Sequence, residues 1–339
     1  MTVASAIDRL LDRQQLSGDE AFAVAGEMLS GNVPPAQVGA LLALLRAGGE
    51  TADVIYGFAR ALRAQMQPVD AGCDGLVDTC GTGGDGRGTF NVSTVSALVA
   101  AGAGCRVAKH GNRRVSSRCG SADVLEALGV RIDLSAADSA EQLRSTGITF
   151  LYAPHFHPGL QRLAPLRRQL GFRTVFNLVG PLANPAGVKR QVVGVFDGAL
   201  IHPVAEALRR LGAEHALIVH GTDGGDEISI VGPTCICELK NGTMIDFEVR
   251  PEQFDLPRGE SERISGGTAA ENAAIAVRIL SGERSPARDI VLLNAGAAIY
   301  VAGLAASLGD GIRMADRSID DGSALARLER LRQYRGAGI

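Results

Sequence analysis

The segment from Asp78 to Thr94 holds the residues of this sequence best suited to chemistry. Five glycines fall within eight positions, from Gly81 to Gly88, and hydroxyl and amide side chains follow them. Because glycine lacks a Cβ, its backbone reaches positive φ and approaches a ligand closely. A loop that bends so freely directs several N–H groups at one anion. Apolar residues before the loop and small residues after it predict a strand, a glycine loop and a helix N-terminus, an arrangement that holds phosphate.

The spacing within this loop matches neither common nucleotide-binding fingerprint. No Gly-Lys-Ser/Thr follows at the P-loop distance, and no Gly-x-Gly-x-x-Gly is followed by an acidic residue about twenty positions on. An ordinary tight turn is the alternative for a glycine-rich loop taken alone. A phosphate bound here is therefore not that of ATP or NAD held in the usual way.

A second candidate anion site lies between Lys109 and Ser121, directly after a predicted strand. Glycines and serines interleave with its cations, as a loop that encloses phosphate requires. A solvated basic loop is the alternative. We expect Ser121 to cap a helix over 122–128, whose N–H groups would point into the same region. The cations are Lys109, Arg113, Arg114 and Arg118.

A third candidate is the acidic segment from Asp223 to Glu227, which follows a predicted strand over 215–220. Mg²⁺ is held by one or two carboxylates, while water and phosphate oxygens complete its coordination. A turn with solvated carboxylates explains such a segment when it stands alone. Beside two phosphate-binding loops, Asp226 and Glu227 indicate a magnesium site.

A fourth candidate is Arg167, on a helix predicted over 157–170. It lies at the edge of that helix's apolar stripe, from which it could reach a cleft and bind a carboxylate with two hydrogen bonds. A surface arginine is the alternative. Gly180-Pro181 predicts a tight wall of the same cleft. The stripe consists of Leu160, Leu163, Leu166 and Leu170.

The elements that must position these residues fall into two parts. Residues 1–66 show only helical periodicity, with starts at Pro34-Pro35 and Thr51, and end in a polar linker. From Leu76 onward strands and helices alternate, which predicts an α/β fold with a mostly parallel sheet covered on both faces. A hairpin is expected over 234–249, and helices again from 268. Strands are predicted over 106–109, 148–152, 191–196, 215–220 and 227–230, and helices over 92–101, 121–128, 135–143, 157–170 and 202–211.

The composition excludes several classes of partner. A net charge of −3 over 339 residues argues against nucleic acid or an anionic membrane as the main partner. Aromatic residues make up 4% with no Trp, so no base-stacking surface is expected. No uncharged apolar run reaches the membrane-spanning length of about 18 residues, and no secretory signal is seen. Six cysteines without a C-x-x-C pair indicate reduced thiols in a cytoplasmic protein.

Together these motifs resemble those of the anthranilate phosphoribosyltransferase family of tryptophan biosynthesis, whose fold is shared with pyrimidine nucleoside phosphorylases. The resemblance covers essentially the whole chain, and no position that the family uses for ligands departs from its pattern. The motifs, all in the family's order, are residues 81–85, 91–94, 109–112, 120–129, 177–182 and 226–227.

The resemblance implies a small helical domain over 1–67, completed by helices near 157–176 and hinged to a large α/β domain over 68–339. It implies transfer of the phosphoribosyl group of 5-phosphoribosyl 1-pyrophosphate (PRPP) to anthranilate, with Mg²⁺ as cofactor and a homodimer formed through the small domains. A pyrimidine nucleoside phosphorylase, which would not need Asp226 and Glu227, is the alternative enzyme. A catalytically silent ligand-binding relative is the other alternative, and it would be expected to carry a damaged motif.

The resemblance also assigns roles to single residues. Those implied as catalytic are Lys109, Asn112 and Arg167. Those implied to hold Mg²⁺ are Ser93, Asp226 and Glu227. Anthranilate would be held by Gly81, Asn112 and Arg167, with His110 and Pro181 along its path. PRPP would be held by Gly81, Gly84, Asp85, Thr89, Asn91, Val92, Ser93, Thr94, Lys109, His110, Gly111, Asn112, Arg113, Arg114, Val115, Ser116, Ser117 and Ser121.

Overall fold

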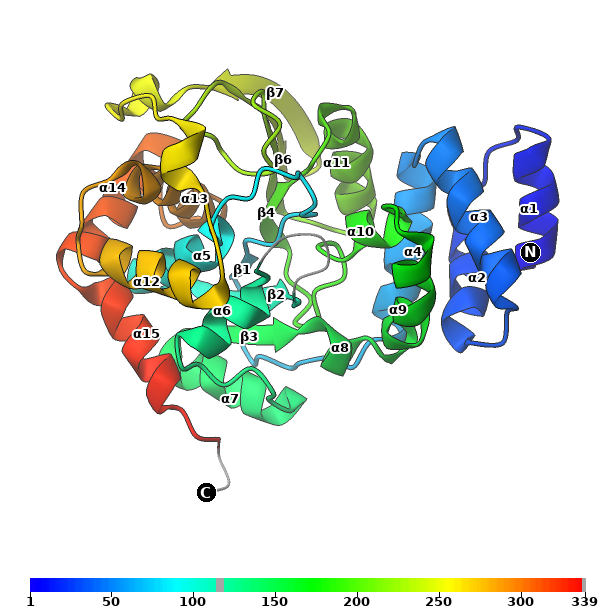
Figure 1. Ribbon diagram of the computed structural model, residues 1–339, viewed down its shortest axis with the longest axis horizontal. Coiled ribbons are helices and arrows are strands. Elements are labelled where there is room, and N and C mark those ends of the chain that lie inside the picture. The colour runs from blue at the N-terminus through cyan, green and yellow to red at the C-terminus, as the bar shows by residue number, and fades with distance from the viewer. Residues whose placement is uncertain (114–118, 337–339) are drawn as a thin grey trace.

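The computed structural model describes residues 1–113 and 119–336. A group of N-terminal helices stands at one side of a central sheet that is wrapped by the remaining helices (Figure 1). This is the expected fold class, a helical part joined to a larger α/β part, and the prediction is confirmed. No helix among the described residues is both long and apolar enough to cross a membrane.

The N-terminal helices begin where the capping signals place them. Thr51 accepts a hydrogen bond from the Val54 N–H at the start of its helix, and Pro35 occupies a first-turn position of the helix before it, where a missing N–H does no harm. Ser17 and Glu20 form a reciprocal capping box. These helices are α1 (Val3–Leu11), α2 (Gly18–Ser30), α3 (Pro35–Gly48) and α4 (Ala52–Gln65).

The sheet has seven strands in the order β3-β2-β1-β4-β5-β6-β7. The first five strands of this order are parallel, and β6 and β7 form the predicted antiparallel hairpin, with Lys240 opposite Thr243. The strands are β1 (Leu76–Asp78), β2 (Arg106–Gly111), β3 (Ile148–Tyr152), β4 (Arg190–Gly194), β5 (His215–Gly221), β6 (Thr234–Lys240) and β7 (Thr243–Val249).

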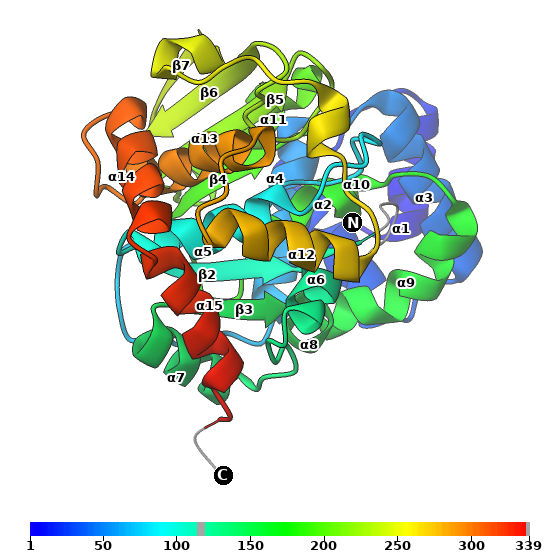
Figure 2. The ribbon, with the colours of Figure 1, turned by 60° about the vertical axis from the view of Figure 1, so that its left-hand side comes forward.

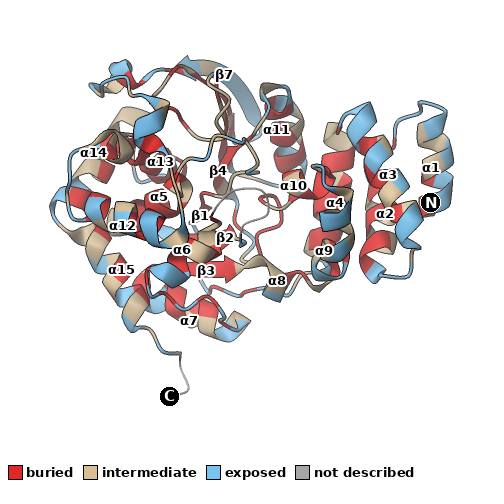
Figure 3. Cartoon of the chain, in the orientation of Figure 1, coloured by how far each residue is buried: buried red, intermediate tan, exposed pale blue. Residues whose placement is uncertain are grey.

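Helices cover both faces of the sheet, so its central strands are buried on both sides. The helices lie on either side of the strands in Figure 2, and Figure 3 colours much of the central strands as buried. Alternate residues of a strand therefore enter different cores: Val192 packs on the face of α5 and α13, and Val193 packs on the face of α11 and the N-terminal helices. The helices after the N-terminal group are α5 (Val92–Gly102), α6 (Ser121–Ala127), α7 (Ala136–Thr146), α8 (Ala153–Phe156), α9 (Pro158–Leu170), α10 (Val175–Val179), α11 (Ile201–Arg210), α12 (Ala269–Leu280), α13 (Pro286–Val301), α14 (Leu308–Asp320) and α15 (Ser323–Gln333).

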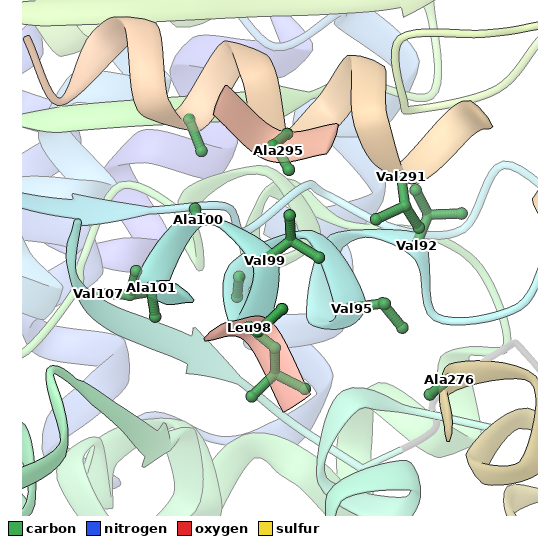
Figure 4. Packing of buried hydrophobic residues seen from close by; sticks show 14 of the residues in the cluster. Val92, Val95, Leu98, Val99, Ala100, Ala101, Val107, Ala276, Val291 and Ala295 are labelled. Atoms are coloured by element: carbon green, nitrogen blue, oxygen red, sulfur yellow. The ribbon is translucent and has the colours of Figure 1, made fainter. Parts of the chain in front are cut away.

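Helix α5, which follows the glycine-rich loop, is buried along almost its whole length. Side chains of α5 and α13 face one another across their contact, with Val92 and Val99 on α5 and Val291 and Ala295 on α13 (Figure 4). A helix packed on several sides has little freedom to shift. The loop before it therefore ends on a fixed support.

The predicted strand over 227–230 is wrong. Ile228 and Ile230 are buried, as the alternating pattern predicts, but they join no ladder. The side chain of Asn294 on α13 replaces the neighbouring strand: its Oδ1 accepts from the Ile228 N–H and its Nδ2 donates to the Ile228 carbonyl, both over 2.9 Å. A side chain 66 residues away satisfies this backbone, so no local pattern reveals it.

Helix α9 packs against α2, α3 and α4, and its Leu163 belongs to the apolar core of the N-terminal helices. Arg63 on α4 donates to the carbonyls of Leu182 and Leu211, over 2.7 and 3.1 Å. The N-terminal helices are thus tied both to α9 and to the chain around the sheet. The exact domain boundaries, 1–67 with 157–176 and 68–339, stay a prediction.

Candidate active site

The loops that carry the predicted motifs meet where the strand order of the sheet reverses. β1 is hydrogen-bonded to β2 on one side and to β4 on the other, and the helices that follow β1 and β4 lie on opposite faces of the sheet. Loops that diverge in this way form the usual ligand site of an open parallel sheet. The Thr82 N–H, after β1, donates to the Gly194 carbonyl at the end of β4 over 2.8 Å and joins the two loops.

The glycine-rich loop has the backbone that its sequence predicts. Gly83, Gly84, Gly86 and Gly88 have φ values between 64° and 78°, which other residues rarely adopt. Gly81 is needed for space instead, because a Cβ there would lie 2.9 Å from Asp226 Oδ2. The loop therefore lies directly against the acidic segment after β5.

Three carboxylates gather at this contact. Asp226 Oδ2 accepts from the Gly83 N–H over 2.8 Å, and Glu227 Oε1 accepts from the Ser93 N–H over 3.2 Å. Burial, followed by the charge of Asp85, raises the pKa of Asp226 to about 6. Burial and the charge of Asp226 also raise the pKa of Glu227. Oxygen donors in a crowded, negatively charged group are the ligands that Mg²⁺ prefers, so these residues fit that ion.

The first turn of α5 lies beside these carboxylates. Asn91 precedes the helix without capping it: its Nδ2 donates to the Cys119 carbonyl over 3.2 Å, and its Oδ1 accepts from Asn272 over 2.9 Å. The Thr94 hydroxyl is buried and has no hydrogen-bond partner within residues 1–113 and 119–336. Of two further residues predicted to bind PRPP, Val92 is buried in the core and Thr89 forms a β-bridge with Ser265.

Lys109, the last cation of β2, is 3% exposed. Its ammonium donates to the Thr79 carbonyl and hydroxyl over 3.1 and 3.3 Å, and to Ser93 Oγ over 3.4 Å. The glycine-rich loop begins after Thr79, and Ser93 belongs to the predicted magnesium site. The structure therefore brings this predicted catalytic cation to the place where phosphate and metal are expected.

The second loop is held at its base by Asn112 and Ser121. The Asn112 N–H donates to Ser121 Oγ, and that hydroxyl donates to the Asn112 carbonyl, both over 3.2 Å. The expectation that Ser121 caps the following helix is wrong, since α6 begins at Ser121 and Gly120 is its cap. The Gly120 N–H donates to Asp123 over 2.9 Å, which leaves the Ser121 hydroxyl to hold the loop. Gly111 must be small, because a Cβ there would lie 2.2 Å from Ser121 Oγ.

The remaining cations of this loop are only partly placed. Arg113 pairs with Glu126, and with Asp123 over 3.3 Å, both on α6. Its guanidinium also lies 5.6 Å from the centre of the Tyr152 ring. The structure thus shows Arg113 bound to acidic side chains, and its contact with a phosphate stays a prediction. The predicted residues Arg114, Val115, Ser116 and Ser117, with Arg118, lie outside the described residues.

Arg167 has a fixed position in α9. Its Nη2 donates to Asn177 Oδ1 over 3.2 Å, and the guanidinium lies 5.6 Å from the centre of the Phe176 ring. The same Asn177 oxygen accepts from the Thr174 N–H over 3.0 Å. Burial lowers the pKa of Arg167 from its ordinary value. Arg167 is therefore half-buried and not a freely solvated surface residue, and a guanidinium in this position would favour an anionic partner.

His110 and Gly180 connect the second loop to the segment after α10. His110 Nδ1 lies 3.1 Å from the Gly180 carbonyl, and its Nε2 has no partner among the described residues. The neighbouring Pro181 is buried, with its carbonyl accepting from Gln191 over 2.8 Å. His157, which no sequence signal singles out, packs on His110 with ring centres 5.1 Å apart.

Another group of possible metal ligands lies elsewhere on the sheet. The ligand atoms of His202 on α11, Cys237 on β6 and Asp246 on β7 lie within 4.8 Å of one another. Burial, followed by a hydrogen bond with Asp246, raises the pKa of the Cys237 thiol to about 12, so it stays protonated at neutral pH. Imidazole and sulfur are also softer ligands than Mg²⁺ prefers. The carboxylates beside the glycine-rich loop therefore fit Mg²⁺ better than this group does.

Three residues that shape the site were missed by the reasoning from sequence. Asp78 and Asn184 are buried and hydrogen-bonded to each other, although 106 residues separate them. Gly194 ends β4, and a Cβ there would lie 1.5 Å from the Asp226 carbonyl. For Asp78, the sequence offered one indication, an acidic residue at the end of an apolar strand. Neither Asn184, which reads as a turn residue, nor Gly194 carried any.

Models of known protein families match both parts of the chain. A model described as the helical bundle domain of a glycosyl transferase family matches residues 4–66, and one described as the a/b domain of a glycosyl transferase family matches residues 74–325. Among individual proteins, the anthranilate phosphoribosyltransferase of Brevibacillus brevis is 48% identical over 334 residues, which cover 98% of each chain.

Solved structures show the same likeness. The anthranilate phosphoribosyltransferase of Thermus thermophilus is 43% identical with a TM-score of 0.91, over 97% of this chain and 98% of that one. The enzyme of Saccharomyces cerevisiae in complex with PRPP and Mg is 29% identical with a TM-score of 0.89, over 97% and 96% of the two chains. The yeast enzyme has also been solved in complex with 4-fluoroanthranilate.

Proposed function

Because the chain belongs to the anthranilate phosphoribosyltransferase family, we propose that the site between β1 and β4 carries out that family's reaction. The phosphoribosyl group of PRPP passes to the nitrogen of anthranilate, and pyrophosphate leaves, in the second step of tryptophan biosynthesis from chorismate. The observation that carries this proposal is the contact of the glycine-rich loop and the first turn of α5 with the half-buried pair Asp226 and Glu227. Backbone N–H donors and carboxylates lie side by side there, which supports a site for a diphosphate with its cation.

Magnesium is the proposed cofactor, as in the yeast complex with PRPP and Mg. Asp226, Glu227 and the Ser93 hydroxyl would hold it. When bound, the ion would neutralise charge on the pyrophosphate that leaves. Asp85 adds negative charge beside Asp226 and Glu227, and this charge contributes to the raised pKa of Asp226.

The chain's own residues are proposed to act mainly through electrostatics and positioning. Lys109 is buried beside the glycine-rich loop, so its charge is weakly screened and favours the departing pyrophosphate. An aromatic amine is neutral at pH 7 and needs little activation by a base. Arg167 would bind the anthranilate carboxylate, and Asn112 would orient the amine toward the ribose. No covalent intermediate with the enzyme is expected.

The test of the function is a direct assay of the purified protein with Mg²⁺. Loss of anthranilate fluorescence on adding PRPP is the expected result. Cleavage of thymidine in the presence of phosphate, with no change in anthranilate, would instead identify a pyrimidine nucleoside phosphorylase. Binding of PRPP without either reaction would identify a silent relative.

Replacing Arg167 by alanine tests the anthranilate site separately. We expect the anthranilate KM to rise roughly tenfold or more, because a charge-assisted bidentate contact contributes about 1.5–3 kcal/mol. The KM for PRPP should change less than twofold. Arg168→Ala, one position along the same helix, is the matched control. An unchanged anthranilate KM in Arg167→Ala would remove Arg167 from the site.

The larger assembly is part of the same proposal. The helical domain, residues 1–67 with 157–176, would close on the domain over 68–339 and exclude water from the activated sugar. Two copies would associate through their helical domains in a cytoplasmic enzyme. Leu11 on α1 is 62% exposed, which is consistent with a face covered by a second copy. No disulfide joins the six cysteines in the part of the chain that the structure describes. Light scattering of the purified protein measures whether it is a dimer.

A further inference from the structure

Asp78, the last residue of β1, lies at the reversal of the strand order and is completely buried. One of its carboxylate oxygens accepts from the Thr79 N–H over 2.7 Å and from the His110 N–H over 3.2 Å. The other oxygen accepts from Asn184 Nδ2 over 2.8 Å. A single side chain therefore joins three segments that are distant in sequence.

Each of these segments leads into a different part of the site. Thr79 immediately precedes the glycine-rich loop. His110 lies beside Lys109 and Asn112 at the base of the second loop. Asn184 follows Gly180 and Pro181, which line the proposed path of anthranilate. We infer that Asp78 is the positioning residue that sets the PRPP-binding loops and the anthranilate path in register with one another. This inference rests on the proposed function.

The chemistry of its contacts excludes a direct role for Asp78 in the reaction. Both oxygens already accept hydrogen bonds from protein donors, and the side chain is not exposed. Burial raises the pKa of Asp78 to about 6, and the charge of Lys109 opposes that rise. The group is therefore mostly ionised at pH 7. It acts as a buried counter-charge for Lys109 and as an acceptor for three donors.

Asn184 extends the connection to two more backbone groups. Its Nδ2 also donates to the Ala108 carbonyl on β2 over 2.7 Å, and its Oδ1 accepts from the Ala186 N–H over 2.9 Å. Its side-chain oxygen and nitrogen are thus both engaged, and the direction of its amide is set. In Asp78→Asn, the remaining side-chain oxygen would accept from the Thr79 and His110 N–H groups. The new NH₂ group would then face the NH₂ group of Asn184, and two donors cannot form a hydrogen bond. The variant keeps the volume of the side chain and breaks the connection to Asn184.

The experiment compares Asp78→Asn with Thr149→Val in the full-length protein. Thr149 on β3 is also fully buried, donates to Gln142 over 2.9 Å and lies outside the proposed site, so its loss reports stability alone. Folded fractions are measured by circular dichroism, and kcat and KM are expressed per folded molecule. Asp78→Asn is expected to lower kcat/KM roughly 10- to 100-fold, while Thr149→Val keeps both constants within twofold. Loss of stability alone in Asp78→Asn, with kcat and KM unchanged, would overturn the inference.

A second variant decides the question if Asp78→Asn does not fold. Asn184→Ala leaves Asp78 its two backbone donors and removes the contacts of Asn184 with Asp78, with the Ala108 carbonyl and with the Ala186 N–H. It should raise the anthranilate KM while the PRPP KM stays within twofold, and any other pattern would overturn the inference. The wild-type protein is assayed in parallel. If it consumes no anthranilate, the proposed function fails, whereas normal variants beside an active wild type refute only the role of Asp78.

Discussion

At the scale of single residues, burial changes the charge state of the two packed histidines. Burial lowers the pKa of His157 to about 4. Burial and the neighbouring His157 lower the pKa of His110 to about 3. Both rings are therefore neutral in the folded protein at pH 7. A neutral ring beside the proposed anthranilate path adds no positive charge that would compete with Arg167 for the carboxylate.

This neutrality predicts a dependence of stability on pH. Unfolded histidine takes up a proton near pH 6.5, but His157 in the folded protein does so only near pH 4. The unfolded state therefore binds more protons between these values, and stability falls as the pH drops through that window. His157→Leu removes this contribution. Between pH 7 and pH 5, we expect the free energy of unfolding of the variant to fall by about 2 kcal/mol less than that of the wild type.

Urea unfolding at the two pH values measures this difference. His155→Leu serves as the control, because His155 lies two positions away and is much less buried. Its pH dependence should match that of the wild type. Equal losses of stability in His157→Leu and in the wild type would show that His157 titrates normally.

At the scale of elements, the sequence predicts an element where its stabilising contacts are local. The strand over 148–152 has the predicted bounds, and the helix capped by Thr51 begins where predicted. Both predictions hold because alternation and capping are properties of neighbouring residues. The error over 227–230 has the opposite cause. Its apolar alternation is real, but Asn294 takes the place of a neighbouring strand. The Ser121 cap fails for a similar reason, since Asn112 engages that hydroxyl.

The end of β4 allows a prediction about one such distant contact. A Cβ on Gly194 would lie 1.5 Å from the Asp226 carbonyl, so Gly194→Ala must push the acidic segment away from the glycine-rich loop. We expect kcat/KM to fall roughly 100-fold, as a displacement of about 1 Å does. Gly48→Ala, at the end of α3 with no atom within 4 Å of the added methyl, is the control and should keep full activity. Wild-type kinetics in Gly194→Ala would show that the two segments need not touch.

At the scale of the whole molecule, the site could be predicted only in its parts. The glycine loop, the basic loop and the acidic segment each have a local signal, and their meeting follows from the parallel strands that precede them. What holds them in register does not have such a signal. Asp78 carries only the weak signal of an acidic residue at the end of an apolar strand, Asn184 carries none, and their pairing depends on which strands become neighbours.

The pair Asp226 and Glu227 affects the stability of the whole molecule: it destabilises the folded protein without ligand and is proposed to bind Mg²⁺. Burial raises the pKa of Asp226 to about 6 and that of Glu227 above its ordinary value, so ionising the pair disfavours folding, and stability falls as the pH rises through these pKa values. The double variant Asp226→Asn with Glu227→Gln removes the cost of ionising these two carboxylates in the folded protein. Without ligand, we expect the double variant to be more stable than the wild type, by an amount on the order of 1–3 kcal/mol.

Ligands should reverse this order. PRPP with Mg²⁺ at about 100 times its Kd would stabilise the wild type by about 2.7 kcal/mol, which corresponds to a rise in Tm of several degrees. The double variant lacks the carboxylates proposed to hold the ion, so adding Mg²⁺ to its mixture with PRPP should not change its Tm. Thermal unfolding followed by circular dichroism, with EDTA replacing Mg²⁺ as the control, measures both effects. If the double variant is less stable than the wild type without ligand, the pair supports the fold. If its Tm still rises on adding Mg²⁺ with PRPP, the ion binds elsewhere.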